Sequence, residues 1–375
     1  MEKVRYGIIG VGVMGTGHAQ YLLDGEIPNA ILTAVCDIDD EALNKPLFAD
    51  VEKFKDYNDL IESGLVDAVI VATPHYFHLP IGKAILDKGI NLLGEKPVTV
   101  DKYDALLLNE AAKNSKALFG IMFMQRTYGI YRKVKQLLTE DAIGEIVRVN
   151  WINTDWFRTE SYYKSGKWRA SWAGEGGGVL VNQSPHNMDL LQWLCGMPVK
   201  VRAFCKYGSK HDIEVEDMVT AYLEYENGAT GVFITTTGEF PGTNRLEITG
   251  DKGKIVVEDG KVFLTTNSLS TADYCKNSDQ KYADNAQNID CNTVEIEIDS
   301  EPFKGPHQAI TDNFTKAILT GSPLTASGFE GINSVELANS MLYSTMTNDT
   351  VTLPLDADAY HSELLKLKAT SRYKG

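Results

Sequence analysis

The sequence predicts two domains of different architecture: an N-terminal doubly wound parallel sheet over residues 1–124 and a C-terminal α+β domain over residues 125–375. Three observations predict this. Strand-like and helix-like segments alternate in the first third of the chain, a glycine-rich turn follows the first strand, and long alternating segments joined by hairpin turns follow later. At 375 residues, the chain is long enough for each domain to bury its own core.

The first strand ends in a turn typical of dinucleotide-binding proteins. The apolar run Tyr6-Gly7-Ile8-Ile9 is followed by the motif Gly10-Val11-Gly12-Val13-Met14-Gly15 and then by an apolar helix. The first glycine permits the tight turn, the second lets the backbone approach a pyrophosphate, and the third lets helix and strand pack closely. The free N–H groups at the helix N-terminus would bind the phosphates. The motif predicts a Rossmann domain whose cofactor contacts include Gly10, Gly12, Val13, Met14 and Gly15.

The second strand, residues 31–36, ends in an acidic residue, Asp37. It follows the last glycine of the motif by roughly 20 residues, where an acid hydrogen-bonds the ribose diol of the adenosine. An acid repels a 2′-phosphate, and no arginine occurs in the next three residues. We therefore expect NAD rather than NADP, with Asp37 and Ile38 at the cofactor. The alternative is that Asp37 only caps the following helix.

Two more strands complete the predicted parallel sheet, residues 67–72 and the segment ending in Glu95-Lys96-Pro97. The turn between them opens a helix that ends near Gly89. Ligands of open α/β sheets bind in the crevice at the carboxyl ends of the strands. We therefore expect Lys96 near the nicotinamide, and cofactor contacts from Thr73, Pro74, His75, His78, Glu95 and Lys96. The two histidines could instead cap or pack.

The pattern changes after residue 124. A helix at residues 130–138 precedes alternating segments at residues 146–156, 199–207, 218–225, 230–237 and 245–249, and Asn227-Gly228 and Asp259-Gly260 are hairpin turn signals. These segments predict a mostly antiparallel sheet that covers one face with its own helices. We expect the open face to form a homo-oligomer interface in a dimer, tetramer or larger assembly. Residues 266–292 are interpreted as a surface insertion without chemistry, and the helix at about 329–345 is expected to pack back toward the first domain.

All five tryptophans fall between residues 151 and 193. Sugars present faces of C–H groups that lie well on aromatic rings, and arginine or asparagine side chains bind sugar hydroxyls. Trp151 and Trp193 are expected in the core because they lie in a strand and an amphipathic helix. The predicted substrate wall consists of Asp155, Trp156, Arg158, Trp168, Arg169 and Trp172.

A second segment with a candidate catalytic residue runs from Gly176 to Asp189. Three glycines precede Ser184-Pro185, which is typical of a helix N-cap and first helical residue. His186 is then fixed in the first turn, where the positive end of the helix lowers its pKa and favours the neutral imidazole that a general base requires. The alternative is a structural histidine.

Together these motifs resemble those of the glucose–fructose oxidoreductase, inositol dehydrogenase and rhizopine catabolism protein (Gfo/Idh/MocA) family. The resemblance covers almost the whole chain and rests on the glycine motif, Thr73-Pro74 with His78, Glu95-Lys96-Pro97, Arg126, and Gly176-Gly177-Gly178 with His186 and Asp189. It implies oxidation or reduction of a sugar or cyclitol carbon with NAD(P). It also implies that Lys96 hydrogen-bonds the reacting oxygen and that His186 is the general base. Further contacts implied are Gln125 with the cofactor and Arg126, Tyr128 and Asn182 with the substrate.

Asn182 departs from the inositol dehydrogenase pattern, which usually has aspartate four residues before the histidine. An asparagine cannot hold charge or accept a proton. The residues around Trp156, Trp168 and Asn182 are similar to a subgroup of glycoside 3-dehydrogenases and levoglucosan-type dehydrogenases. This predicts oxidation of a secondary ring hydroxyl, C3 of a glucose unit or glycoside, by NAD. The alternatives are an inositol or cyclitol dehydrogenase, an NAD-dependent glycoside-cleaving enzyme, and a non-catalytic NAD-dependent sensor.

Composition excludes other classes. The net charge of −15 argues against a nucleic-acid surface and against anionic membranes. No apolar run approaches the roughly 20 residues of a membrane helix, and the N-terminus has no signal-peptide pattern. The five cysteines are scattered without a Cys-x-x-Cys pair. We therefore expect free thiols in a cytoplasmic protein and no metal site.

Overall fold

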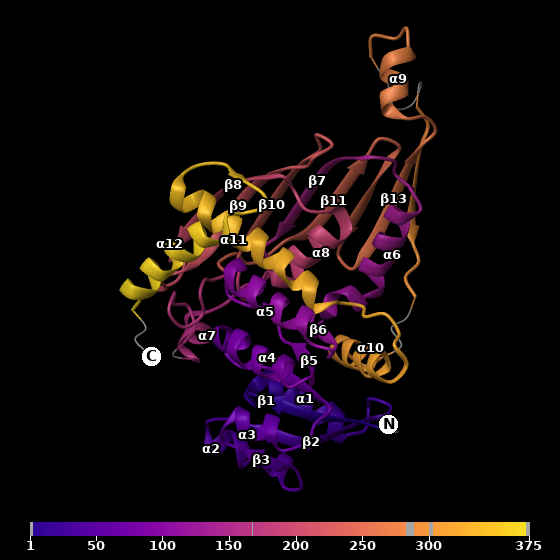
Figure 1. Cartoon of the computed structure of the whole chain (residues 1–375). Coiled ribbons are helices and arrows are strands. Elements are labelled where there is room, and N and C mark those ends of the chain that lie inside the picture. Colours follow the sequence, from indigo (N-terminus) through magenta and orange to yellow (C-terminus); the bar gives the residue numbers. More distant parts are fainter. Residues whose placement is uncertain (1–2, 167, 283–288, 300–302, 373–375) are drawn as a thin grey trace.

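The computed structural model describes residues 3–166, 168–282, 289–299 and 303–372. It contains a six-stranded sheet in the order β3-β2-β1-β4-β5-β6 and a nine-stranded sheet in the order β14-β13-β12-β11-β7-β10-β9-β8-β15 (Figure 1). The predicted fold class is therefore confirmed. In the described part of the chain, no helix combines the length and apolar character needed to cross a membrane. All five cysteines are free.

The six-stranded sheet is parallel throughout. Its strands are β1 (Val4–Ile9), β2 (Ala30–Cys36), β3 (Glu52–Phe54), β4 (Ala68–Val71), β5 (Asn91–Gly94) and β6 (Phe119–Ile121). The connecting helices are α1 (Val13–Leu23), α2 (Asp40–Leu43), α3 (Tyr57–Glu62), α4 (His78–Asp87) and α5 (Lys102–Asn114), with short 3₁₀ turns η1 (Pro46–Phe48) and η2 (His75–Phe77). The sheet reverses its strand order between β1 and β4, so the carboxyl ends of these strands form the crevice that binds ligands in such folds.

The nine-stranded sheet is antiparallel except where β10 runs parallel to β7. Its strands are β7 (Ile146–Asn153), β8 (Lys200–Tyr207), β9 (Glu216–Glu224), β10 (Thr230–Thr236), β11 (Asn244–Gly250), β12 (Gly253–Glu258), β13 (Lys261–Asn267), β14 (Cys291–Ile296) and β15 (Val351–Thr352). Asp259 and Gly260 both have positive φ, as a two-residue type I′ hairpin turn requires.

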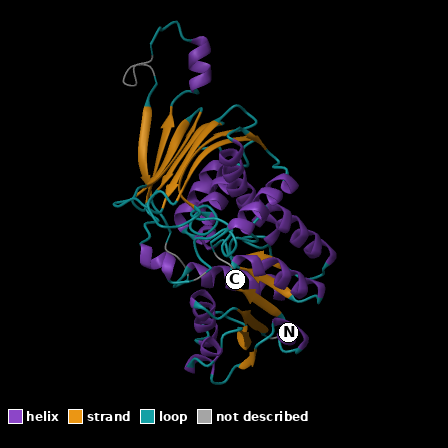
Figure 2. Ribbon diagram, turned by 90° about the vertical axis from the view of Figure 1, so that its left-hand side faces the viewer, coloured by secondary structure: helices purple, strands orange, loops and turns teal. Residues whose placement is uncertain are grey.

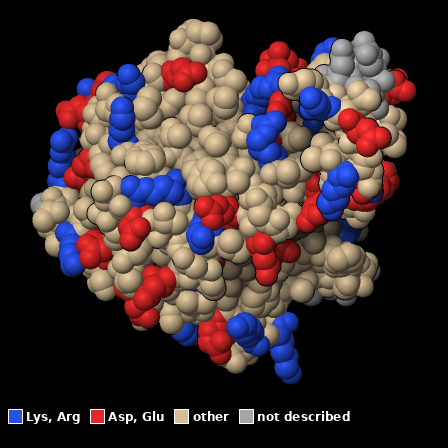
Figure 3. All heavy atoms as spheres, turned by 90° about the horizontal axis from the view of Figure 1, so that it is seen from above, with Lys and Arg blue, Asp and Glu red and all other residues tan. Residues whose placement is uncertain are grey.

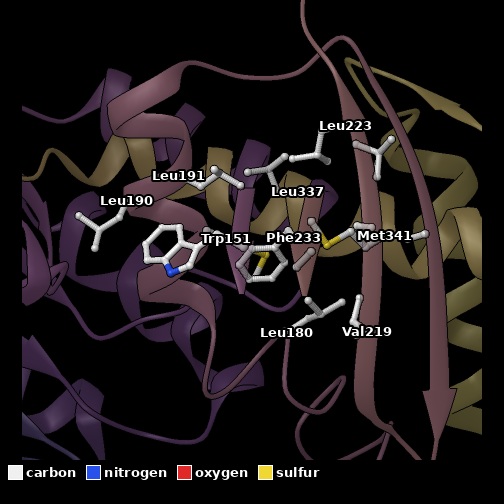
Figure 4. Close-up of a cluster of buried hydrophobic side chains, with 14 of the residues drawn as sticks. Trp151, Leu180, Leu190, Leu191, Val219, Leu223, Phe233, Leu337 and Met341 are labelled. Atoms are coloured by element: carbon white, nitrogen blue, oxygen red, sulfur yellow. The ribbon is translucent and has the colours of Figure 1, made fainter. Parts of the chain in front are cut away.

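Helices cover one face of the nine-stranded sheet (Figure 2). Those packed near it are α6 (Gly129–Thr139), α8 (Pro185–Cys195) and α11 (Gly331–Thr347). The core beneath them contains Trp151, Phe233, Leu191 and Met341 (Figure 4). On the other face, Val147, Phe204 and Tyr222 are exposed by 52%, 59% and 42%. This face is the open one.

The C-terminal part of the chain returns to the first sheet through α10 (Pro306–Thr320), a helix that the sequence patterns did not predict. Phe314 is buried in the same cluster as Tyr6 and Ile8 of β1. The hydroxyl groups of Tyr6 and Thr315 are hydrogen-bonded at 2.8 Å. Helix α11, together with η4 (Gly328–Glu330), contacts α5 of the first sheet as well as α8 and β8.

Three further helices lie near the surface: α7 (Glu160–Lys164), α9 (Thr271–Asn277) and α12 (Ala357–Thr370). Helix α9 projects beyond the sheet in Figure 1, within the segment predicted to be a surface insertion; residues 283–288 of that segment lie outside the described residues. Seen from above, basic and acidic side chains are interspersed around an uncharged area (Figure 3). This face therefore has no continuous basic track.

Candidate active site

The glycine motif has the geometry that a pyrophosphate requires. Gly10 has a φ of +88°, and a Cβ at this position would lie 2.7 Å from the Ala72 carbonyl oxygen. A Cβ on Gly15 would lie 1.8 Å from the Gly10 carbonyl oxygen, whereas a Cβ on Gly12 would meet nothing within 4 Å. Gly10 and Gly15 are therefore required by the protein's own packing, and Gly12 leaves open space beside the loop.

Apolar side chains lie exposed around this loop. Val13, Met14 and Ile38 are exposed by 90%, 44% and 88%. Their positions, at the start of α1 and directly after β2, are those at which a Rossmann fold holds the adenosine half of a dinucleotide. A bound cofactor would remove some of this apolar surface from water, which is favourable.

Asp37 braces the glycine turn from the end of β2. One carboxylate oxygen accepts a hydrogen bond from the Val11 amide at 2.8 Å, and the other accepts from the Asp39 amide at 3.0 Å. Lys45 lies on the same turn, since its Nζ donates to the Val11 carbonyl and to the Thr16 hydroxyl, both at 2.8 Å. Lys45 was not predicted from the sequence, because no motif fixes a position in that loop.

The two histidines after β4 have different surroundings. Both ring nitrogens of His78 face carbonyl oxygens, those of Pro97 at 2.8 Å and Thr73 at 2.9 Å, so His78 ties the turn to the end of β5. The Nδ1 of His75 donates to the Glu175 carbonyl at 3.1 Å, and its ring packs edge-on against Trp168. Burial holds the pKa of His75 well below its usual range. His75 therefore lies neutral beside the substrate-side loop, and His78 has the packing role that was its alternative.

Glu95 lies buried behind the lysine that follows it. Its Oε1 lies 2.7 Å from His18 Nε2, and its Oε2 accepts from the Lys96 amide at 3.1 Å. Burial alone would raise the pKa of Glu95, but the hydrogen bond from His18 and the charges of His18, His307 and Lys96 together outweigh it, and the pKa is about 2. A cofactor contact was predicted for Glu95; in the structure both of its oxygens are engaged within the protein. His18 was not recognised from the sequence.

Lys96 extends from the end of β5 to the second domain. Its Nζ donates to the Asn182 carbonyl at 2.8 Å, and the side chain is half-buried. Burial lowers the pKa of Lys96, and the charges of Glu95 and Glu175 oppose that shift. An ammonium has three donors, so one hydrogen bond leaves two for a substrate oxygen.

His186 is in the first turn of α8, after Pro185 at the first helical position, as predicted. It is 5% exposed, and its Nδ1 is buried with no hydrogen-bond partner in the described part of the chain. Burial, followed by the charge of Lys96, lowers its pKa well below the usual range. The pKa of His186 is therefore lowered, as predicted, but the main cause is burial rather than the positive end of the helix. Ser184 does not cap the helix through its side chain, because its hydroxyl is hydrogen-bonded to that of Thr235 at 3.0 Å.

A buried carboxyl that the sequence analysis missed connects these groups. Glu175 is 2% exposed. Its Oε1 accepts from the Asn182 side-chain amide and lies 3.7 Å from the Arg169 guanidinium, and its Oε2 accepts from the Ala170 amide at 2.6 Å. Burial raises its pKa. Asn182 thus joins an acid on one side to Lys96 on the other; an acidic residue directly before three glycines was the available signal.

Two arginines and three aromatic rings form a stacked group beside this carboxyl, which we call the arginine–aromatic wall: Trp156, Arg158, Tyr162, Trp168 and Arg169. The Arg158 guanidinium lies 5.6 Å from the Trp156 ring and 5.0 Å from the Tyr162 ring. The Arg169 guanidinium lies 4.7 Å from the Tyr162 ring and 4.6 Å from the Trp168 ring. The Trp156 indole donates to the Asn187 side chain at 3.0 Å.

Two predicted substrate residues belong to the core instead. Trp172 is 5% exposed and packs against Tyr207, so the wall prediction was wrong for this tryptophan. Arg126 is 2% exposed and forms two hydrogen bonds of 2.9 and 2.6 Å with Asp189. Its remaining nitrogen pairs with Glu330. Both side chains are fully engaged by the protein, which leaves neither free to bind substrate.

The three remaining predicted residues, Asp155, Gln125 and Tyr128, differ in their surroundings. The Asp155 carboxylate is held by the side-chain amides of Asn153 and Asn244, at 2.8 and 3.1 Å. Gln125 is 9% exposed, and Tyr128 stacks on Tyr131.

Among the described residues, the side chains of Asp101, Asp104 and His361 have possible metal-ligand atoms within 4.8 Å of one another. Asp101, however, is already hydrogen-bonded to His361 and caps helix α5.

Comparison with known proteins agrees with this geometry. Residues 4–123 match the family model described as "Oxidoreductase family, NAD-binding Rossmann fold", and residues 131–256 match "GFO/IDH/MocA C-terminal domain". Inositol 2-dehydrogenase of Corynebacterium glutamicum is 26% identical over 236 residues, which span 60% of this chain and 65% of that relative.

Solved structures extend the likeness to nearly the whole chain. The WlbA dehydrogenase from Bordetella pertussis, solved with NADH and UDP-GlcNAcA, matches with a TM-score of 0.79 at 25% identity, over 95% of this chain and 99% of that one. Levoglucosan dehydrogenase, solved with NADH, shares the fold with a TM-score of 0.76 at 20% identity, over 94% of this chain and 100% of that one. The chain belongs to the Gfo/Idh/MocA oxidoreductase family.

Proposed function

We propose that this protein is an NAD-dependent dehydrogenase that oxidises a secondary ring hydroxyl of a sugar, C3 of a glucose unit or glycoside, to a ketone. The observation that carries the proposal is the meeting of Lys96, from the end of the parallel sheet, with His186 and Asn182 of the second domain. The charge of Lys96 acts on His186, and its ammonium is bonded to the Asn182 carbonyl.

His186 and Lys96 have separate roles in the proposed reaction. Buried and neutral, His186 accepts the proton of the substrate hydroxyl. The Lys96 ammonium donates a hydrogen bond to the oxygen as it becomes an alkoxide. Such a donor contributes several kcal/mol where water is excluded. NAD, when bound, supplies the nicotinamide C4 that takes the hydride. One alcohol and one NAD⁺ then give one ketone, one NADH and one proton.

A second function, inositol or cyclitol dehydrogenation, is favoured by the relatives, because inositol 2-dehydrogenases of several bacteria match this chain at 24–26% identity. Against it stands Asn182, where an aspartate is expected. A panel read at 340 nm decides between them: glucosides and 1,5-anhydro sugars against myo- and scyllo-inositol. Faster NADH formation from the inositols would overturn our preference.

A glycoside-cleaving enzyme and a non-catalytic sensor would each give a different readout. The cleaving enzyme, with resident NAD, would release free sugar without net NADH. The sensor would tolerate loss of Lys96 and His186 without losing its response to ligand. We also propose that the open sheet face pairs copies of this chain; a monomer by light scattering at micromolar concentration would refute this.

A further inference from the structure

We propose that the sugar oxidised at this site is anionic, bearing a carboxylate or phosphate, and that Arg158 and Arg169 bind this group. The inference rests on the proposed sugar oxidation and adds the substrate class. It comes from the arginine–aromatic wall, which holds two cations, one of which, Arg158, has no acidic partner among the described residues.

The two arginines stack on the same tyrosine ring. Arg158 follows β7, Arg169 lies in the turn before Glu175, and both guanidiniums lie over the ring of Tyr162. The Tyr162 hydroxyl accepts from Arg169 at 2.9 Å and from the Gln183 amide at 3.0 Å, which fixes the ring between them. Stacking occupies the faces of the guanidiniums. Of their N–H groups, one of Arg169 is bonded to Tyr162 and lies near Glu175, and one of Arg158 is bonded to Phe157, which leaves the others for a ligand.

Both arginines lie near enough to Lys96 for their charges to act on it. The charges of Arg169 and Arg158 both act to lower the pKa of Lys96. Three cations therefore lie close enough to repel one another. Two buried carboxyls of the described chain face these cations. Glu95 acts on Lys96, and Glu175 lies 3.7 Å from Arg169 and is also bonded to Ala170 and Asn182.

The side-chain nitrogens of Arg158 are only partly engaged by the protein. Its terminal nitrogen donates to the neighbouring Phe157 carbonyl at 2.9 Å, and its Nε is buried without a hydrogen-bond partner. Among the residues that the structure describes, no carboxylate lies within ion-pair distance of Arg158. In contrast, Arg5, Arg148 and Arg245 are each paired with an acid, in a chain with 51 acidic and 36 basic residues.

A guanidinium without an acid partner in a half-buried site is costly unless an anion joins it. The planar fork of arginine matches a carboxylate or phosphate with two parallel hydrogen bonds, which a neutral hydroxyl cannot offer. The wall therefore fits a sugar whose ring stacks on an aromatic face while its acidic group reaches the guanidinium edges.

The experiment compares kcat/KM for NADH formation from methyl glucoside, methyl glucuronide and glucose 6-phosphate. We expect at least one anionic sugar to exceed the glucoside about tenfold or more, and the two acids distinguish carboxylate from phosphate. The ratio of kcat/KM for the preferred anionic sugar to kcat/KM for the glucoside should fall toward one in Arg158→Gln and in Arg169→Gln. Arg158→Lys should give an intermediate ratio. Arg202→Gln is the matched control, because Arg202 stacks on Phe204 of β8.

Two outcomes overturn the proposal: a glucoside as good as both acids in the wild type, or equal losses for neutral and acidic sugars in the arginine variants. Calorimetric titration of the NADH complex with methyl glucuronide and glucose 6-phosphate separates this inference from the proposed function. Binding that depends on Arg158 without turnover would support the anion site and refute the oxidation. NADH formation from neutral sugars alone would support the oxidation and refute the anion site.

Discussion

Substituting Glu175 by glutamine tests whether this buried carboxyl sets the electrostatics of Lys96. The variant keeps the size of the side chain and removes its charge. Because the Glu175 charge raises the pKa of Lys96, its loss lowers that pKa further below 10.5. The proposed role requires protonated Lys96, so activity is lost as pH rises through its pKa. The alkaline limb of kcat/KM should therefore move to lower pH.

The size of the effect follows from the contacts of the carboxyl. One oxygen accepts from Ala170 and the other from Asn182, with Arg169 at 3.7 Å. A glutamine offers one acceptor, so one buried donor is left unpaired at about 1–3 kcal/mol. If this whole free-energy cost also applies to the transition state, kcat/KM falls by about one to two orders of magnitude. The free energy of unfolding falls by the same 1–3 kcal/mol, a few degrees of Tm.

The assay is a pH profile of kcat/KM from pH 6 to 10.5, read as NADH formation. The pKa of His186 lies well below 6.5, so no acid limb from this residue should appear near neutrality. Glu214→Gln is the control: Glu214 braces the same turn through the Trp172 amide at 2.8 Å but does not bond Asn182. An unmoved alkaline limb in Glu175→Gln, or the same movement in the control, refutes the reasoning.

Three further predictions concern the cofactor, the reacting lysine and the core. Lys96→Ala should reduce turnover by about two or more orders of magnitude with NADH affinity nearly intact by fluorescence titration; an equal loss of NADH binding would make Lys96 a cofactor ligand. Gly12→Val should abolish NADH binding while the Tm is kept, whereas Gly15→Ala should lower the Tm, since its Cβ meets backbone at 1.8 Å; the opposite pattern would contradict the assigned roles. Arg126→Met should cost about 3–5 kcal/mol in urea unfolding because it leaves Asp189 buried and unpaired, and a change below about 1 kcal/mol would show that the pair is not buried in solution.

Local patterns predicted the parts of the site that follow from chain direction. A strand followed by a glycine motif fixes the first turn, and Lys96 follows a strand of a parallel sheet, so its edge of the sheet was predictable. His186 was predictable because serine and proline mark a helix start. The cause of its lowered pKa was not, since burial depends on what the whole fold packs around the ring.

Other residues depended on partners far away in the sequence. Arg126 meets Asp189 from 63 positions away, and no local pattern distinguishes an arginine that binds substrate from one that meets an acid in the core. Trp172 lies in glycine-rich surroundings that resemble those of Trp168, yet the turn directs it into the core. Glu175 acquires its role only from the folding of residues 170–182 around it.

The return of α10 to the first sheet constrains the order in which the chain can fold during synthesis. Phe314 and Ile310 are 1% and 3% exposed within the core of that sheet, and a Cβ on Gly120 would come within 2.8 Å of the Phe314 ring. Burying two such side chains contributes about 3–6 kcal/mol, a large part of the 5–15 kcal/mol that stabilises a typical domain. Although domains usually fold as they leave the ribosome, the cofactor-binding half must wait for residues beyond 314. We therefore expect a fragment that ends near residue 124 to be a poor autonomous NAD-binding module.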